Sequence, residues 1–331
     1  MTARRSILLC SAMQALALLA AAPAAAQEAF PIKDRPIAIV VPFAAGSGTD
    51  AIARAVAEKM AVTLKTPIIV ENKPGASGQL ASEYVARAAP DGHTLLMGGN
   101  STHSANPYLF KRLKYDPIKD FTPIGLATIA PLALLVPAAS PAKTAAELVQ
   151  LARTKPGGLS YGYSNTGGQI SSAMFVNSGR LTATPVPYKD APRMLTDLAS
   201  NQIDFAIIDF AAARPMMTAN RVRALATTSR NRISVAKDTP AMRETPVPGY
   251  ENYEMASWVG LFGPANVAPA TAAQLNAALS SALAEPDVRD RLINQMMQEI
   301  MPQQLSEFST FLREQDEIYR RRIKEAGMVA E

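Results

Sequence analysis

Three segments of the chain combine glycines with hydroxyl or amide side chains, each where an apolar run gives way to a helical pattern. Glycine lets the backbone approach a ligand closely, and unpaired N–H groups at a helix start attract an anion. Turns and helix caps use the same residue types, so one such segment alone allows that simpler interpretation. Since the segments are divided between two strand–helix units, together they indicate a carboxylate or similar anion held between the units. The candidate ligand-binding residues in these segments are Phe43, Ala44, Ala45, Gly46, Ser47, Gly48, Thr49, Asp50, Asn100, Ser101, Ser164, Asn165, Thr166, Gly167, Gly168 and Gln169.

The first segment also matches a nucleotide-binding fingerprint. Gly46 to Ala51 fits the pattern G-x-G-x-x-A, and Glu71 ends the next strand, where an acid would bind a ribose. However, Pro42 to Ala45 separate the strand from the first glycine, so the tight turn of that motif is missing. We therefore expect no cofactor. For Asp50 the sequence leaves two alternative roles open: it caps the helix, or it binds an ammonium group of the ligand.

Groups suited to catalysis are scarce. The only histidines are His93, expected to be exposed in a turn, and His103, which either lines a cleft or serves the loop structurally. Neither belongs to a metal-ligand spacing such as H-E-x-x-H. The run Gly162 to Thr166 lacks the last glycine of a G-x-S-x-G elbow. Without a positioned base no serine can be assigned as a nucleophile, so the sequence predicts neither an enzyme nor a metal site.

The elements that carry these segments alternate between strands and helices. Alternation with short connections is typical of parallel sheets with right-handed crossovers. The first unit is predicted to contain strands at 37–41, 67–70 and 94–97 with helices at 50–62 and 79–88. After an extended stretch at 121–136, a second parallel unit is predicted from strands at 159–163, 185–188, 203–208 and 224–227 with helices at 144–155, 170–178 and 191–200. A strand at 258–262 and helices that begin near 269, 287 and 304 complete the chain.

The N-terminus has the pattern of a signal peptide. Arg4 and Arg5 precede an apolar stretch at 7–22, and Ala24 to Ala26 offer the small residues that signal peptidase accepts, so cleavage is expected after Ala26. The single cysteine, Cys10, lies in this leader, which leaves a mature chain without disulfides or thiolate sites. No later segment approaches about 18 uninterrupted apolar residues, the length of a membrane span. These features predict export to the periplasm.

The remaining composition excludes one further class of partner. The chain has 331 residues, of which 18% are charged, and a formal net charge of +5. Its lysines and arginines are scattered and form no basic stripe interleaved with aromatic residues. Nucleic acid is therefore not an expected partner.

Short motifs follow one another along nearly the whole mature chain. They are 39–43 with 48–50, 70–76, 86–96, 106–109, 115–117 with 120–121, 155–157, 186–189, 258–261 and 286–289. Each motif is modest alone, but their order and spacing together are specific. The series resembles the Bug family, also called TctC-like receptors, which are the extracytoplasmic solute receptors of tripartite tricarboxylate transporters.

The resemblance implies a type II periplasmic-binding-protein fold, or Venus flytrap, in which two α/β lobes are joined by two crossing strands. The crossings would lie near 130–136 and 256–262, with 27–130 and 252–331 in lobe 1 and 131–251 in lobe 2. Members of the family bind small carboxylates through the first and third segments. The resemblance adds Tyr188, Lys189 and Asp209 as residues near the cleft. It also places Asp190 where the family has glycine, which leads to the hypothesis that Asp190 favours a ligand with an amine or amide.

The function that the resemblance implies is transport. A monomeric receptor would capture a small carboxylate between its lobes and deliver it to the membrane permease of a tripartite tricarboxylate transporter. The sequence leaves open a second role, in which the closed receptor engages a sensor histidine kinase. A secreted hydrolase is a third alternative, but it would need a catalytic triad that we cannot assign.

Overall fold

The computed structural model describes residues 30–233 and 236–330. The predicted leader and its cleavage after Ala26 lie outside these residues. From residue 33 onward the chain groups into one compact unit. No helix in the described ranges is both long enough and apolar enough to cross a membrane.

One half of the sheet is built from the first three strands of the chain. β1 (Ile37–Val41) pairs in parallel with β2 (Ile68–Asn72) and with β3 (Thr94–Gly99), as the sequence predicted. β9 (Ala256–Pro264) then pairs antiparallel with β3 and with the first part of β4 (Phe121–Pro137). We call this half lobe 1.

The other half, lobe 2, begins where β4 leaves β9. The last residues of β4 pair antiparallel with β7 (Phe205–Asp209) and β8 (Val222–Thr227). β5 (Leu159–Tyr163) pairs in parallel with β6 (Ala183–Pro187) and with β7. The four strands predicted for the second unit thus run parallel to one another, and β4 adds an antiparallel strand to them. The reason is that β4 enters from lobe 1 as a long strand and not through a helical crossover.

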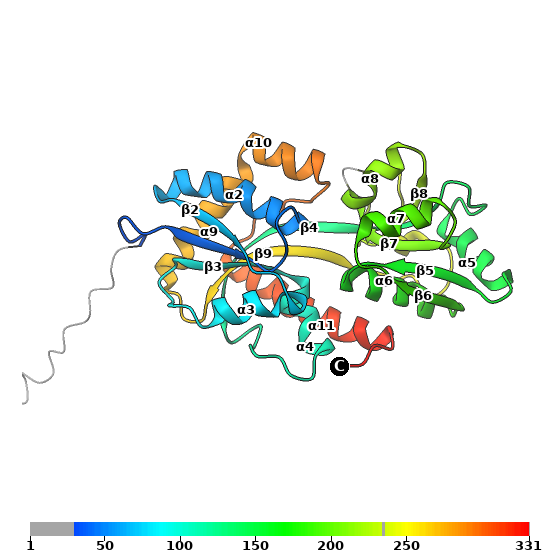
Figure 1. The fold of residues 1–331 in the computed structure, drawn as a ribbon, viewed down its shortest axis with the longest axis horizontal. Coiled ribbons are helices and arrows are strands. Elements are labelled where there is room, and N and C mark those ends of the chain that lie inside the picture. The colour runs from blue at the N-terminus through cyan, green and yellow to red at the C-terminus, as the bar shows by residue number, and fades with distance from the viewer. Residues whose placement is uncertain (1–29, 234–235, 331) are drawn as a thin grey trace, which may run out of the picture. The chain divides into compact units, whose positions relative to one another are not determined.

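Helices cover both faces of the lobe 1 sheet (Figure 1). α2 (Gly48–Leu64) packs against α9 (Pro269–Ala284) on one side. On the other side α3 (Gln79–Ala86) and α11 (Leu305–Glu325) enclose a core in which Trp258 and Phe262 are buried. The short helices α4 (Asn106–Leu109) and α10 (Pro286–Arg289) complete this half.

In lobe 2 the alternation of β4 side chains divides the core in two. Leu132, Leu134 and Val136 face the cluster formed with α5 (Ala145–Thr154) and α6 (Thr166–Ser178). Ala133 and Leu135 face the opposite cluster, formed with α7 (Ala191–Ala199) and α8 (Phe210–Thr218). Successive side chains of a strand point to opposite faces, so an unbroken apolar run is what a strand covered on both faces requires.

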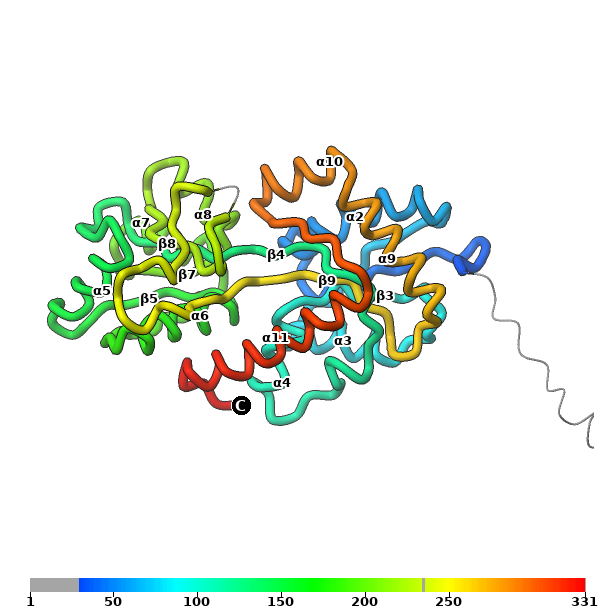
Figure 2. Tube along the Cα trace, turned by 180° about the vertical axis from the view of Figure 1, so that it is seen from behind, coloured from blue at the N-terminus to red at the C-terminus, as the bar shows by residue number. Residues whose placement is uncertain are grey.

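The two halves define a two-lobed α/β fold of the periplasmic-binding-protein type, with β4 and β9 running between the lobes (Figures 1 and 2). The fold class predicted from the sequence is confirmed. The helix α8 was not predicted, and it proves to matter for the site. The predicted lobe boundaries, after Ala130 and after Glu251, remain a prediction.

Candidate functional site

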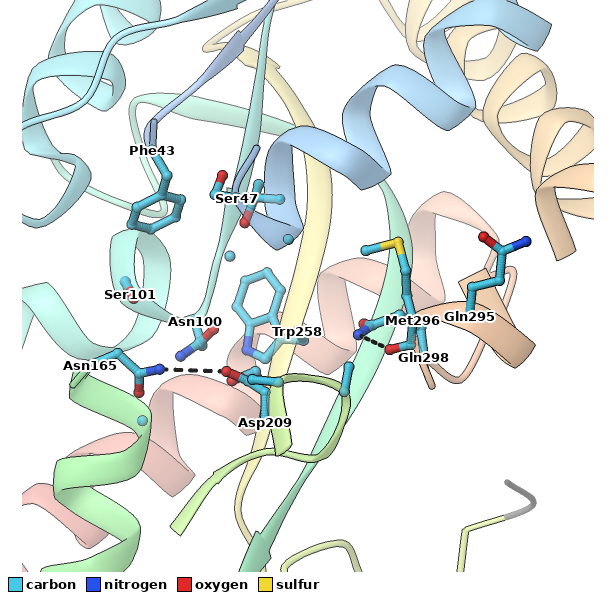
Figure 3. Close-up of a pocket in the computed structure, with 17 residues that line it drawn as sticks. Phe43, Ser47, Asn100, Ser101, Asn165, Asp209, Trp258, Gln295, Met296 and Gln298 are labelled. Atoms are coloured by element: carbon cyan, nitrogen blue, oxygen red, sulfur yellow. Dashed lines mark hydrogen bonds between the residues drawn. The ribbon is translucent and has the colours of Figure 1, made fainter. Parts of the chain in front are cut away.

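A cavity of 530 Å³ lies where loops of both lobes meet, and Figure 3 shows the side chains around it. It belongs to the size range of small-molecule sites. Residues from all three predicted segments contribute to its wall. The predicted residues that line it are Phe43, Ser47, Gly48, Thr49, Asn100, Ser101, Asn165, Gly167 and Asp209.

The first segment is held in place by Asp50, which is buried behind it. Its carboxylate accepts hydrogen bonds from the Gly46 N–H at 2.9 Å, from Arg54 Nε at 3.0 Å and from Asn72 Nδ2 at 2.9 Å. The hydrogen bond from Arg54 is the main reason that the pKa of Asp50 falls to about 2. The helix cap is Ser47, so the capping role predicted for Asp50 is wrong, and Asp50 does not line the cavity in which an ammonium group would lie. Asp50 therefore positions the loop.

The start of α2 leaves backbone donors at the cavity. The first N–H groups of any helix have no partner within the helix. Ser47 Oγ accepts the N–H of Asp50 at 3.3 Å, whereas Gly48 and Thr49, just before it in the first turn, line the cavity. These two residues bring the free amides of the helix start to the space in which an anion would be stabilised.

α6 repeats the arrangement from lobe 2. Asn165 caps it by accepting the Gly168 N–H at Oδ1, at 2.8 Å, while Gly167 lines the cavity. Because Oδ1 is occupied in this way, the Nδ2 group of Asn165 is the one that turns to Asp209 Oδ2, at 3.4 Å. The third predicted segment is thus both a capped helix and part of the cavity wall, so its two interpretations are not exclusive.

α8 supplies a further helix start, which the sequence did not predict. Ala211 and Ala212 in its first turn line the cavity, and Asp209 occupies the cap position without a side-chain cap hydrogen bond. Burial raises the pKa of Asp209, an effect that Ser257 and Asn165 partly offset by stabilising the ionised form. Asp209 is the only ionisable side chain among the described residues of the wall.

The second segment forms a π-helical turn, Ser101–Ala105, at the end of β3. Asn100 and Ser101 reach the cavity, but His103 is buried outside its wall. Burial lowers the pKa of His103 to about 3, so the ring is neutral at pH 7. His93 is buried as well and contacts Pro36 O through Nδ1 at 3.1 Å, so the expectation that it is exposed was wrong.

Part of the predicted set lies outside the cavity wall. Tyr188 donates to Asp197 Oδ2 at 3.0 Å, and Asp190 caps α7 by accepting the Arg193 N–H at 2.9 Å. The hypothesis that Asp190 selects the ligand therefore loses its geometric basis. The predicted residues that do not line the cavity are Ala44, Ala45, Gly46, Asp50, Ser164, Thr166, Gly168, Gln169, Tyr188 and Lys189.

The sequence missed a second group of wall residues. Ser257 and the single tryptophan, Trp258, come from β9, which was predicted as a strand but not as part of the site. The segment after α10 forms another part of the wall (Figure 3). The wall residues that were not predicted are Gly99, Ala211, Ala212, Ser257, Trp258, Gln295, Met296 and Gln298.

The cavity wall offers a ligand hydrogen-bond donors rather than cationic side chains. The described wall contains no lysine, arginine or histidine, so backbone amides and neutral side chains are its donors. No group of three or more His, Cys, Asp or Glu residues within the described ranges could hold a metal ion. A two-lobed fold with helix N-termini converging on a cavity between the lobes defines the class of solute-binding receptors.

Comparison with known proteins identifies the family. The model of the tripartite tricarboxylate transporter family receptors (TctC) matches residues 52–328, and the chain belongs to this family. It is 34% identical over 268 residues to the "UPF0065 protein in tcbD-tcbE intergenic region" of Pseudomonas sp., covering 80% of this chain and 78% of the relative. It is 27% identical to the protein BugT of Bordetella pertussis, covering 75% and 76%.

Two solved structures of Rhodopseudomonas palustris are similar over almost their whole length. MatC with bound malate is 33% identical, with a TM-score of 0.75, and the match covers 88% of this chain and 100% of MatC. Rpa4515 with adipate is 28% identical, with a TM-score of 0.80, and the match covers 90% and 99%. The family resemblance inferred from the sequence motifs is confirmed.

Proposed function

We propose that this chain is a periplasmic receptor that captures a small carboxylate between its lobes and delivers it to the membrane permease of a tripartite tricarboxylate transporter, without catalysing a reaction. On this proposal residues 1–26 are its export signal. The observation that carries the proposal is the convergence of the first turns of α2, α6 and α8 on one cavity whose described wall contains no cationic side chain. Helix N-termini each carry a partial positive charge and free donors, which is what a carboxylate needs.

The family and its solved members support the chemistry. Malate and adipate, held by the two similar structures, are both small dicarboxylates. The cavity of 530 Å³ has room for a ligand of that size. A ligand that contacts both α2 and α6 stabilises the arrangement in which the lobes are close, because only differential affinity shifts such an equilibrium.

The proposal is tested by ligand screening with thermal unfolding and calorimetry. The panel contains mono-, di- and tricarboxylates, amino acids and nicotinate-type aromatic acids. A true ligand at about 100 times its Kd stabilises the folded protein by about 2.7 kcal/mol and raises the melting temperature. Failure of every anionic compound to bind would contradict the proposal.

Gly167 offers a variant that blocks the cavity without disturbing the fold. A Cβ atom at Gly167 would lie 3.5 Å from Ser257 Oγ and 3.9 Å from Asn100 Nδ2, which are ordinary contacts. Gly167→Val is therefore expected to fold normally but to weaken ligand binding at least 10-fold. Ala44→Val is the matched control, since Ala44 is exposed and does not line the cavity. Equal affinity of the two variants would show that this cavity is not the binding site.

A further inference from the structure

We propose that Asp209 selects the ligand: the preferred solute is a carboxylate that also carries an ammonium group, and the ammonium group binds to Asp209. This inference rests on the proposed function and specifies its ligand class. It runs against the simplest extrapolation from the malate-bound and adipate-bound structures, which is that this chain also binds a dicarboxylate. The reasons lie in the distribution of charge around the cavity.

The first reason is that Asp209 has no compensating cation in the wall. It is the sole ionisable side chain among the described wall residues, and it lies half-buried at the end of β7. A carboxylate can accept about four hydrogen bonds. Asn165 provides one long hydrogen bond, 3.4 Å from Nδ2 to Oδ2, and the Ser257 hydroxyl and the backbone N–H of Asp209 itself are two further donors. All three donors are neutral, so a cation is what would best stabilise this half-buried anion, and the ligand is the available source.

The second reason is that the side chain of Asp209 does not cap α8. It occupies the cap position of α8, but its side chain makes no cap hydrogen bond. Asp190 and Thr144 show the alternative, since each caps the first turn of its own helix through a side-chain oxygen. The carboxylate of Asp209 is directed instead toward Asn165 across the cavity (Figure 3).

The third reason is that the two sides of the cavity offer different groups to a bipolar ligand. Gly48 and Thr49 at the start of α2 present backbone donors, which suit a carboxylate, and Figure 3 shows the start of α2, at Ser47, away from Asp209. Asp209 presents the one formal charge, which is negative and suits an ammonium group. A dicarboxylate would place its second charge near Asp209, where like charges repel and neither is screened as it would be in open water.

The test uses ligands that differ at one terminal group. One set is butanoate, succinate and 4-aminobutanoate, and the other is pentanoate, glutarate and 5-aminopentanoate, all measured by calorimetry on the mature protein. The ammonium compound of a set is expected to bind at least 10-fold more tightly than the dicarboxylate. Asp209→Asn, which keeps the shape of the side chain, should weaken the ammonium compound 10- to 100-fold and strengthen the dicarboxylate several-fold.

The controls separate this inference from the function itself. Asp238→Asn removes an exposed acid outside the cavity wall and should change no affinity. A wild-type protein that prefers the dicarboxylates would overturn the role of Asp209 and leave carboxylate binding intact. That comparison needs no variant, so it holds even if Asp209→Asn does not fold. If neither set contains a binder and the amino acids of the wider panel do not bind, while carboxylates without an ammonium group do, the ligand class proposed here is wrong and the receptor function stands.

Discussion

His103 lies beneath the second loop and stacks on the ring of Phe262, with ring centroids 3.8 Å apart. Its Nδ1 is 2.9 Å from Thr102 Oγ1, and its Nε2 is buried without a partner among the described residues. Desolvation alone lowers its pKa to about 3, since no charged group offsets the cost of burying a protonated ring. The neutral ring thus belongs to the packing that holds the loop and not to the binding of ligand.

We predict a pH dependence of stability from this residue. The unfolded chain protonates His103 below about pH 6.5 while the folded chain does not, so the stabilisation falls as the pH falls from 6.5 toward 3. The loss is about 1.4 kcal/mol per pH unit within that window. Urea unfolding at pH 6.5, 5.5 and 4.5 measures it. In the His103→Gln variant, the free energy of unfolding should fall less steeply with pH, by up to about 1.4 kcal/mol per pH unit, which corresponds to one proton. Identical slopes in the variant and the wild type would contradict the prediction.

For single residues, the sequence predicted which loop residues lie at the site better than it predicted what they do there. Ser47, Asn165 and Gly167 were found because glycine and capping residues follow recognisable rules at helix starts. Asp50 was singled out, and Arg54 lies four residues later on the same helix, but Asn72 reaches Asp50 only when β2 lies beside α2. Trp258 gave no signal as a wall residue, because a tryptophan in an apolar strand is typical of a core.

At the scale of elements, α6 lies unusually close to β7. A Cβ atom at Gly168 would lie 2.5 Å from the Ile207 carbonyl oxygen, a distance that the backbone cannot accept. The contact sets the position of the first turn of α6 and therefore of Gly167 in the cavity. Glycine at this point serves the packing of a helix on a strand and not the ligand directly.

A pair of substitutions tests this packing. Gly168→Ala should destabilise the protein by about 1–3 kcal/mol, since the helix must move away from β7, and should also weaken ligand binding. Gly167→Ala is the matched comparison one residue earlier, where the new methyl group meets only ordinary contacts, and should be neutral or slightly stabilising. Urea unfolding of both variants measures the difference. Equal stability would show that α6 can shift freely.

The elements that the sequence failed to predict share a physical cause. α8 is short, contains Pro215 and follows β7 directly, so its periodic signal is weak, although Asp209 at its start is a residue type that often caps helices. The wall segment around Gln298 is irregular and is held by tertiary contacts, including the Glu299 N–H donated to Ile129 O at 2.8 Å. The local sequence pattern does not predict such tertiary contacts. The strands and long amphipathic helices were predicted because their periodicity is local.

For the whole molecule, β4 and β9 are not the only links between the lobes. α11 buries Phe308 in the core of lobe 1, and it buries Tyr319 and Ile323 in a core of lobe 2. Tyr319 OH donates to Ala256 O at 3.1 Å, where β9 begins. Movement of the lobes is therefore constrained along α11, and the lobes are expected to separate on a side away from it (Figure 2).

A contact between the lobes lies beside the cavity. Arg214 on α8 donates through Nη1 to the carbonyl oxygens of Asn294 and Gln295, the latter at 3.4 Å. These carbonyls end the π-helical turn Asp290–Gln295, and a cation at a helix C-terminus satisfies carbonyl groups that lack partners within the helix. Since α8 follows Asp209 in lobe 2, while Gln295 is a wall residue of lobe 1, Arg214 connects parts of the cavity wall from both lobes.

We predict that Arg214→Ala releases ligand faster while capture is little changed, because weakening a contact that holds the two lobes together acts mainly on the dissociation rate. The expected increase in that rate is about 5- to 30-fold, corresponding to loss of about 1–2 kcal/mol from a charge-assisted hydrogen bond. Trp258, the single tryptophan, lines the cavity, so its fluorescence in stopped-flow mixing reports both rates. Arg221→Ala removes an exposed arginine of the same lobe and should leave both rates unchanged. The prediction would be contradicted if Arg214→Ala slowed capture and left release unaffected. Arg214 would then act before the ligand is bound, and its contact with Asn294 and Gln295 would not hold the ligand in the cavity.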